Sequence, residues 1–460
     1  MPSSLALLVT IGFVVFLFWK DSRRQPGASW ALWIPLIWML IIGSRFVSQW
    51  LRVLSLPMGP VTLEEGSPID AIVFFLLIAG GIFVLRERQV RIREIVNHNG
   101  WLTVFLVYCL VSILWSDFPF VALKRWVKVI GHPIMVLILL TEPEREEAVA
   151  ILVRRCAYIL VPLSILLIKY YPQWGRGFDE WGRSVNTGVT TNKNELGWLC
   201  FVLGFFWFWN LLRSRGLDDR KLRRGEFLLS ALFLVMIGWL LHTAHSATSL
   251  VSLATGVIIL LVLGMRFVRT EFVGSYIVAA ALMLAAAEGV FDVSSHVLSF
   301  LGKDPTLTDR TFVWQDVLSV PLNPLVGAGF ESFWLGERRV KLAEKWTWEP
   351  NQAHNGYLET YLNLGLIGLG FLIILLFATY FKARRELQQD FEWGKCRLGF
   401  LICVVIFNWT EATFKAMHLV WFAFYIIAID FPKVAQLEAA MGLPERNEES
   451  FGSELACEQA

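Results

Sequence analysis

Thirteen long apolar runs occupy most of this chain, and each approaches the length that a helix needs to cross a bilayer. Apolar residues make up 56% of the sequence, which is high for a soluble protein of this length. The pattern predicts an all-α fold, a polytopic membrane helix bundle of about 12–13 spans with long loops on its outer side. The runs cover residues 4–19, 29–43, 70–85, 101–115, 127–140, 148–168, 196–212, 227–241, 250–265, 272–287, 364–380, 398–409 and 419–429.

The distribution of basic residues predicts how the bundle is oriented. Short loops rich in Lys and Arg stay in the cytoplasm, and such loops fall in alternate connections, at 20–24, 86–93, 213–224, 266–269 and 382–385. The N-terminus is then outside and the C-terminus inside. The first run lacks a small-residue cleavage pattern and precedes further runs, so we interpret it as an anchor. The outer face receives the segments 44–69, 170–194 and 290–356. Residues 1–432 form one catalytic bundle, and the acidic tail 433–460 is predicted to be disordered and cytoplasmic.

The longest outer segment ends in a polar cluster with a proton-transfer residue, His354-Asn355, which runs directly into an apolar helix. An imidazole at a membrane surface titrates near neutral pH and can serve as a general base. The alternative interpretation is a helix-capping Asn355 beside an interfacial histidine. Downstream, Gly365 and Gly368 lie one helical turn apart.

A second outer segment is dense in Gly, Trp and cations, and it contains Arg176, Arg183, Lys193 and Asn194. Arg makes bidentate, charge-assisted contacts with phosphates, and glycines expose the backbone to such a ligand. The pattern therefore predicts a phosphate or diphosphate site. The alternative is an aromatic belt at the membrane interface with snorkelling cations.

Other polar residues complete the candidate site. Arg310 and Trp314 share one face of a short predicted helix, so Arg310 is expected to be held in place. Glu411 is an ionisable group near membrane depth and a default functional candidate. His242 and His245, at the outer end of a span, are interpreted as helix-end residues rather than as part of an acceptor groove.

Several of these segments together carry a resemblance to a known family. His354-Asn355, nine residues, Gly365, two residues and Gly368 resemble the signature of the O-antigen ligase and polymerase superfamily of bacterial membrane glycosyltransferases. Further segments resemble the superfamily in the same order, at 190–197, 310–314 and 324–330. Early segments resemble its exopolysaccharide polymerase branch, of succinoglycan type, at 44–50, 115–117 and 124–126.

The resemblance implies transfer of a glycan from a polyprenyl-diphosphate carrier to an acceptor sugar hydroxyl, at the periplasmic face of the inner membrane. Its substrate and partners are then a polyprenyl-diphosphate-linked oligosaccharide, membrane lipid, and candidate flippase and chain-length-control proteins, with no nucleic acid and no cofactor. His354 is the candidate base, and Arg310 with Arg176, Arg183 or Lys193 is the candidate stabiliser of the leaving diphosphate. The outer loops contain no Asp-x-Asp pair, so a metal-independent enzyme is expected.

Two alternatives remain open at this point. Within the superfamily, a ligase that transfers finished glycan to lipid A core or protein would share the catalytic residues and differ in its acceptor. In another class, a transporter or flippase of lipid-linked glycan would show internal repeats and polar groups near the bilayer midplane. The unusual residues of this chain are instead concentrated in loops on one side. This favours polymerisation of lipid-linked repeat units into exopolysaccharide.

Overall fold

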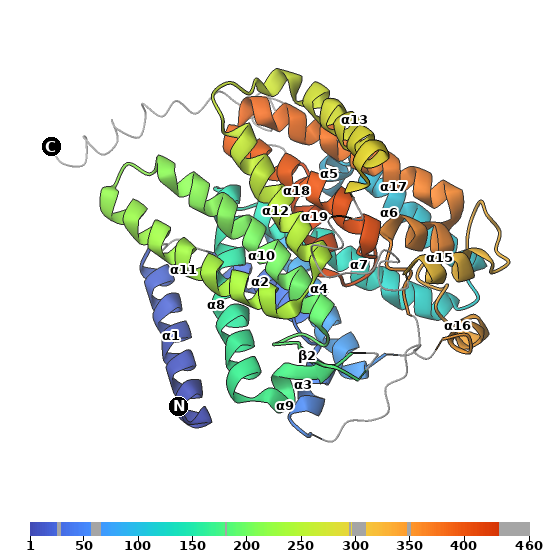
Figure 1. The fold of residues 1–460 in the computed structure, drawn as a ribbon, viewed down its shortest axis with the longest axis horizontal. Coiled ribbons are helices and arrows are strands. Elements are labelled where there is room, and N and C mark those ends of the chain that lie inside the picture. The colour runs from blue at the N-terminus through green and yellow to red at the C-terminus, as the bar shows by residue number, and fades with distance from the viewer. Residues whose placement is uncertain are drawn as a thin grey trace.

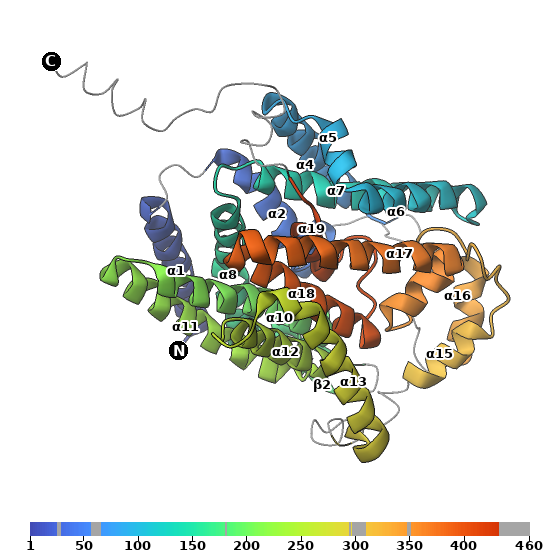
Figure 2. The ribbon, with the colours of Figure 1, turned by 90° about the horizontal axis from the view of Figure 1, so that it is seen from above.

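A computed structural model shows a bundle of helices with one small hairpin of strands (Figures 1 and 2). It describes residues 1–24, 29–56, 66–179, 182–293, 296, 310–346 and 351–431. The predicted tail 433–460 lies outside the described residues. The α-helices are α1 (Ser3–Arg24), α2 (Trp33–Ile42), α3 (Val47–Val53), α4 (Pro68–Glu87), α5 (Ile92–His98), α6 (Gly100–Val111), α7 (Pro119–Leu140), α8 (Arg145–Tyr170), α9 (Pro172–Gly175), α10 (Lys193–Arg213), α11 (Arg220–Ala244), α12 (Ala247–Leu263), α13 (Val273–Phe291), α15 (Arg310–Leu318), α16 (Gly336–Ala343), α17 (Gly356–Gln389), α18 (Phe391–Thr410) and α19 (Leu419–Ala428).

Short 3-10 helices extend four of these elements or join them: η1 (Trp30–Leu32), η2 (Ser112–Trp115), η3 (Ser214–Gly216) and η4 (Thr270–Phe272). The two strands, β1 (Arg176–Phe178) and β2 (Ser184–Asn186), pair antiparallel, with Gly177 opposite Val185. The all-α prediction did not include this hairpin. Its strands are only three residues long, too short for an alternating pattern to stand out in the sequence.

The predicted membrane bundle is confirmed. Each of the thirteen apolar runs coincides with a helix or with two consecutive helices. Within the described residues, seven helices are long and apolar enough to span a bilayer on their own. Two bent pairs, η1–α2 with α3 and α5 with α6–η2, raise this number to nine, with bends of 58° and 102°. α12 and α19 are shorter apolar helices. The chain is therefore a multi-pass membrane protein.

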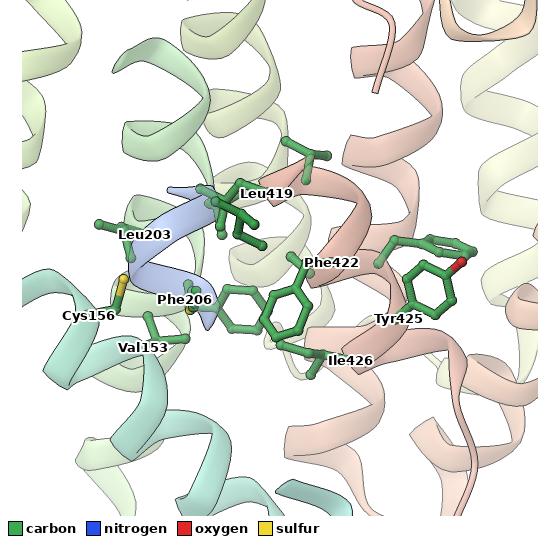
Figure 3. Close-up of a cluster of buried hydrophobic side chains, with 14 of the residues drawn as sticks. Val153, Cys156, Leu203, Phe206, Leu419, Phe422, Tyr425 and Ile426 are labelled. Atoms are coloured by element: carbon green, nitrogen blue, oxygen red, sulfur yellow. The ribbon is translucent and has the colours of Figure 1, made fainter. Parts of the chain in front are cut away.

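The centre of the bundle is built by α8, α10 and α19. In α8 and in α10, 83% of the most apolar 18-residue stretch is buried, and all ten residues of α19 are buried. Side chains of these three helices, among them Phe206 and Phe422, meet in one cluster (Figure 3). By contrast, α1 and α13 lie at the edge of the molecule (Figures 1 and 2). Only 11% and 6% of their most apolar 18-residue stretches are buried. Their apolar faces suit contact with lipid.

Contacts between the segments that connect the helices show which of these segments lie at the same end of the bundle. Among the predicted outer segments, Arg45 Nη2 donates to the carbonyl of Trp174 at 2.7 Å, and Arg338 pairs with Asp117 at 2.6 Å. Thus segments far apart in sequence gather at one end. We call it the site end, because it also carries the residues of the candidate site.

The predicted cytoplasmic connections are linked in the same way at the other end. Arg88, in the loop 86–93, donates to Thr141 Oγ1 at 2.6 Å, and Lys382, in the segment 382–385, donates to Asn99 Oδ1 at 2.7 Å. The alternation expected from the basic loops therefore agrees with which connections touch each other. That the site end faces the periplasm stays a prediction.

A break in α17 joins this helix to the preceding loop. Gly365 has φ 67° and ψ −169°, a conformation essentially restricted to glycine. The break frees two amide groups, and loop carbonyls accept from them: Leu366 N donates to Pro324 O at 2.9 Å, and Ile367 N to Leu325 O at 3.1 Å. A Cβ at position 365 would lie 2.2 Å from the Leu325 backbone. The glycine of the signature thus permits close backbone approach.

Candidate functional site

The site end brings together the two residues predicted to be catalytic around one buried carboxylate. Glu411 follows the last residue of α18 and is only 1% exposed. Arg310, the first residue of α15, donates through Nη2 to Glu411 Oε1 at 2.9 Å and through Nη1 to the carbonyl of Thr410. Nδ1 of His354 lies 3.5 Å from Glu411 Oε2. Residues separated by up to 101 positions therefore form one Arg–Glu–His cluster.

Electrostatics keep this central carboxyl ionised. Burial alone would raise the pKa of Glu411, but the charge of Arg310 and the contacts with His354 lower this pKa to about 2. The carboxylate is therefore charged at neutral pH. It can hold Arg310 in place and can stabilise a positive charge that develops on His354.

Local backbone structure fixes the position of His354. The residue has φ 49°, a left-handed conformation that turns the chain just before α17. Asn355 is the N-cap of this helix: its Oδ1 accepts from the amides of Tyr357 and Leu358, both at 3.0 Å. Its Nδ2 donates to the carbonyl of Trp409 at 3.1 Å. The capping interpretation of Asn355 is thus confirmed. The cap anchors residues 352–354, which we call the histidine turn, to α18.

The residue before His354 is held from both sides. Trp314 Nε1 donates to the carbonyl of Ala353 at 2.7 Å, so α15 supports the turn as well as supplying Arg310. The Ala353 amide donates at 2.8 Å to the buried carboxylate of Glu359, which also accepts from Trp334 Nε1 at 2.8 Å. Trp314 therefore positions the backbone of the histidine turn.

A second polar group reaches the same ring nitrogen of His354. Gln352 Nε2 lies 3.3 Å from His354 Nδ1. Gln352 Oε1 in turn accepts at 2.8 Å from Nζ of Lys415, which lies in the α18–α19 loop. Glu411 and Lys415 thus reach the histidine from one loop, one directly and the other through an amide.

The remaining predicted cations lie in the hairpin loop and at the start of α10. Arg183 and Lys193 both face Asp179, with Arg183 Nε at 2.9 Å and Lys193 Nζ at 3.6 Å from its Oδ2. Arg176 Nε donates to the carbonyl of Ile168 at 3.2 Å. Asn194 is half-buried in the first turn of α10.

A cavity of about 450 Å³ lies beside this loop. Its lining includes the pair Arg183 and Lys193 but not Arg176 or Asn194, and it also includes His242, which with His245 had been interpreted as a helix-end residue only. Both histidines stand at the end of α11, so the two descriptions hold together.

One hydrogen bond connects the cavity wall to the Arg–Glu–His cluster. Ser246, Ala247 and Leu250 line the cavity. Between them, Thr248 shares a hydrogen bond of 2.8 Å between hydroxyls with Thr410, whose carbonyl accepts from Arg310. The cavity and the cluster are therefore neighbours at the site end.

Sequence reasoning missed several polar residues of the site. Gln352, Glu359 and Lys415 contact the histidine turn or its backbone, and Asp179 faces the two loop cations. A signal existed for Gln352 and Glu359, because both flank His354 within five positions. Lys415 follows Glu411 by four positions in a loop, and no periodicity predicts which way a loop side chain points.

Comparison with known proteins confirms the resemblance predicted from the sequence. Residues 231–373 match the family described as O-Antigen ligase, a region that contains Arg310, His354 and part of the cavity wall. Residues 60–166 match a family of unknown function. The chain is thus similar to the O-antigen ligase superfamily, near its exopolysaccharide branch.

Two named relatives show the same relation. The chain is 28% identical over 314 residues to the exopolysaccharide production protein ExoQ of Rhizobium meliloti (strain 1021), covering 63% of this chain and 66% of ExoQ. It is 23% identical over 167 residues to a Rickettsia felis protein named "Putative polysaccharide ligase", covering 34% of this chain and 40% of that protein. The match thus spans just under two thirds of ExoQ and less of the second relative.

Proposed function

We propose that this protein polymerises polyprenyl-diphosphate-linked oligosaccharide repeat units at the periplasmic face of the inner membrane. The observation that carries the proposal is the Arg310–Glu411–His354 cluster, because it holds a base and a cation beside one another. The similarity to ExoQ, a protein named for exopolysaccharide production, extends over more of the chain than the similarity to the ligase. It supports a role in exopolysaccharide synthesis, and the sequence resemblance to the polymerase branch favours polymerisation.

In the proposed reaction, His354 is the general base. With its Nδ1 proton directed at Glu411, Nε2 carries the lone pair that accepts the proton of the acceptor sugar hydroxyl. The hydroxyl oxygen forms the new bond to the anomeric carbon of the donor, and the bond from that carbon to the diphosphate breaks. The resulting imidazolium is stabilised by the Glu411 carboxylate, 3.5 Å away.

The leaving diphosphate needs positive charge, which we assign to Arg310 and to the Arg183–Lys193 pair at the cavity. Each of these cations faces one carboxylate, Glu411 or Asp179, which holds it in place before substrate binds. Such preorganised charge stabilises a developing anion without reorganisation during the reaction. Of the two loop arginines, Arg183 is the stronger candidate because it lines the cavity.

We further propose that these cations act in place of a divalent ion. Activity of the purified enzyme should then survive an excess of chelator. Complete loss in chelator, restored by added magnesium or manganese, would contradict this part of the proposal.

Surface glycan from a deletion strain tests the proposed reaction against the ligase alternative. A polymerase defect leaves single repeat units on the lipid carrier, whereas a ligase defect leaves long unattached chains. Purified protein that extends a lipid-diphosphate donor into polymer, without any transport step, separates the enzyme from a transporter. Convergence of His354 and Arg310 on one carboxylate supports the enzyme.

A further inference from the structure

The contacts of one ring nitrogen, Nδ1 of His354, contain a conflict. Glu411 Oε2 lies 3.5 Å from it and Gln352 Nε2 lies 3.3 Å from it. A carboxylate can only accept a hydrogen bond, and an amide nitrogen can only donate one. A neutral imidazole offers at Nδ1 either a proton or a lone pair, so it can satisfy one of these neighbours but not both.

The orientation of the Gln352 amide is fixed by Lys415. An ammonium group has no acceptor, so Lys415 Nζ must face the amide oxygen, which it does at 2.8 Å. The amide nitrogen of Gln352 is then turned toward His354. Gln352 is 8% exposed, so water has little access to replace either contact.

Glu411 shows which neighbour is satisfied in this arrangement. Its buried Oε2 lies 3.5 Å from Nδ1, a longer contact than that of Gln352, and makes no shorter hydrogen bond within the described part of the chain. The amide of Gln352, by contrast, is within hydrogen-bonding distance of both Lys415 and His354. The contacts therefore favour a lone pair on Nδ1 and a proton on Nε2.

We propose that Gln352, oriented by Lys415, is a positioning residue that holds resting His354 in the tautomer with its proton on Nε2, and that Glu411 holds the opposite, base-competent tautomer. The inference rests on the proposed function: the tautomer matters for transfer only if His354 is the general base. Only the second tautomer has the free lone pair on Nε2 that this role needs. The Lys415–Gln352 pair then keeps His354 from acting as a base until the hydrogen bond from the Gln352 amide to Nδ1 breaks.

Within the described residues, the other charged groups near the histidine turn contact neighbours of the ring and not the ring itself. Arg310 lies behind Glu411 and pairs with its other oxygen, Oε1. Glu359 accepts from the amide of Ala353 and not from the ring. Glu411 and the Lys415–Gln352 pair are thus the two arms that act on Nδ1.

Nitrogen NMR of ¹⁵N-histidine-labelled full-length protein in lipid tests the two arms directly. The His354 signals are identified by their loss in His354→Ala, and their shifts report which nitrogen carries the proton. We expect an Nε2 proton in the wild type and an Nδ1 proton in Gln352→Leu. The protonation midpoint of the ring should rise by about 0.5–1 pH unit in that variant, because the lost amide donor favoured the neutral ring.

The sign of the shift separates this role from simple packing. An apolar Leu beside the ring would by itself lower the midpoint, since burial disfavours the charged form. Only loss of the donor raises it. Lys415→Met should act in the same direction as Gln352→Leu, Lys415→Arg should resemble the wild type, and Glu411→Gln should lower the midpoint. An Nδ1 proton in the wild type, or a midpoint in Gln352→Leu that is unchanged or lower, overturns the proposal.

Transfer assays distinguish failure of this inference from failure of the proposed function. At alkaline pH, Gln352→Leu should transfer glycan about two to five times faster than the wild type, since one opposing hydrogen bond is gone. Slower transfer would contradict the restraint. If instead His354→Ala retains full activity, the proposed base is wrong, while the NMR result still decides whether Gln352 sets the tautomer.

Discussion

The two ends of the bundle differ in the partners of their buried charged side chains. At the end opposite the site, Arg397 is 1% exposed and faces Asp430 at 2.7 Å, Glu386 at 3.4 Å and the carbonyl of Ile427 at 2.7 Å. At the site end, Glu411 is equally buried, but its partners are Arg310 at 2.9 Å and, at 3.5 Å, a histidine that is charged only when it is protonated. The first network pairs permanent charges, whereas the second includes a partner whose charge can change.

This difference distinguishes structural charge from functional charge. Permanently charged side chains that pair with each other stabilise the positions of helices. Removing one partner leaves the other buried with less charge compensation. Polar groups that share a partner, as the carboxylate of Glu411 and the amide of Gln352 share His354, can change their contacts when substrate arrives. Substitutions at the two ends should therefore affect different measurements.

The largest effect is expected at His354. His354→Ala should reduce transfer by about two to four orders of magnitude, because the general base is lost. Protein amount and membrane insertion should stay normal, since the turn is held by the hydrogen bonds of Trp314, Glu359 and Asn355, which the substitution leaves in place. The matched control is His98→Ala, an exposed histidine at the opposite end. Wild-type polymer yield from a normally expressed His354→Ala protein would remove His354 from the mechanism.

At the opposite end, stability rather than turnover should change. Arg397→Met removes the most buried cation of this network, which faces both Asp430 and Glu386. Asp430 is left with Lys382 and the exposed Arg385, and Glu386 with Arg145, so we expect a cost of up to about 3–5 kcal/mol. The unfolding temperature of the purified protein should drop sharply, while the folded fraction keeps normal turnover per molecule. Arg385→Met is the control: Arg385 also pairs with Asp430, at 3.0 Å, but is 63% exposed, so its loss should hardly matter. Equal destabilisation by both variants would argue against this contrast.

Replacement of arginines by lysine should give a smaller loss that depends on geometry. Arg310→Lys cannot reach both Thr410 and Glu411 with one planar fork, so we expect transfer to fall about tenfold or more. Arg183→Lys should be impaired more than Arg176→Lys, because only Arg183 lines the cavity. Full activity in all three variants, measured with purified enzyme and lipid-diphosphate donor, would favour simple anchoring in the headgroup layer.

The assignment of the site end to the periplasm can be tested without any effect on activity. In a Cys457→Ser background, Ser184→Cys should react with an impermeant thiol reagent added to intact cells, and Asp218→Cys should not. Both positions are exposed, and the five cysteines among the described residues are buried. Labelling of position 218 from outside would reverse the orientation.

The sequence predicted the parts of the structure that follow from periodicity and charge. The apolar runs identified the helices, the basic loops separated the two ends, and His354, Arg310 and Glu411 were each selected as candidates. Their convergence could not be predicted, because it depends on how a loop after α18 meets a short helix 101 positions earlier.

Side-chain pairing explains the other omissions. Asp179 was read as part of a cation-rich loop, and only the hairpin shows that its carboxylate lies between Arg183 and Lys193. The contact of Lys415 with Gln352 likewise depends on a distance of 2.8 Å between two side chains. Such distances have no signature in residue spacing.

The break at Gly365 has a consequence for how the protein is made. Because the amides of Leu366 and Ile367 bond to carbonyls of residues 324–325, α17 completes its hydrogen bonds only with a loop that was synthesised earlier. An unpaired amide is costly inside a bilayer. The nascent helix can therefore settle in the membrane only after that loop has reached the site end. Assembly of the last three helices, and with it the histidine turn, therefore depends on the loop having reached the site end.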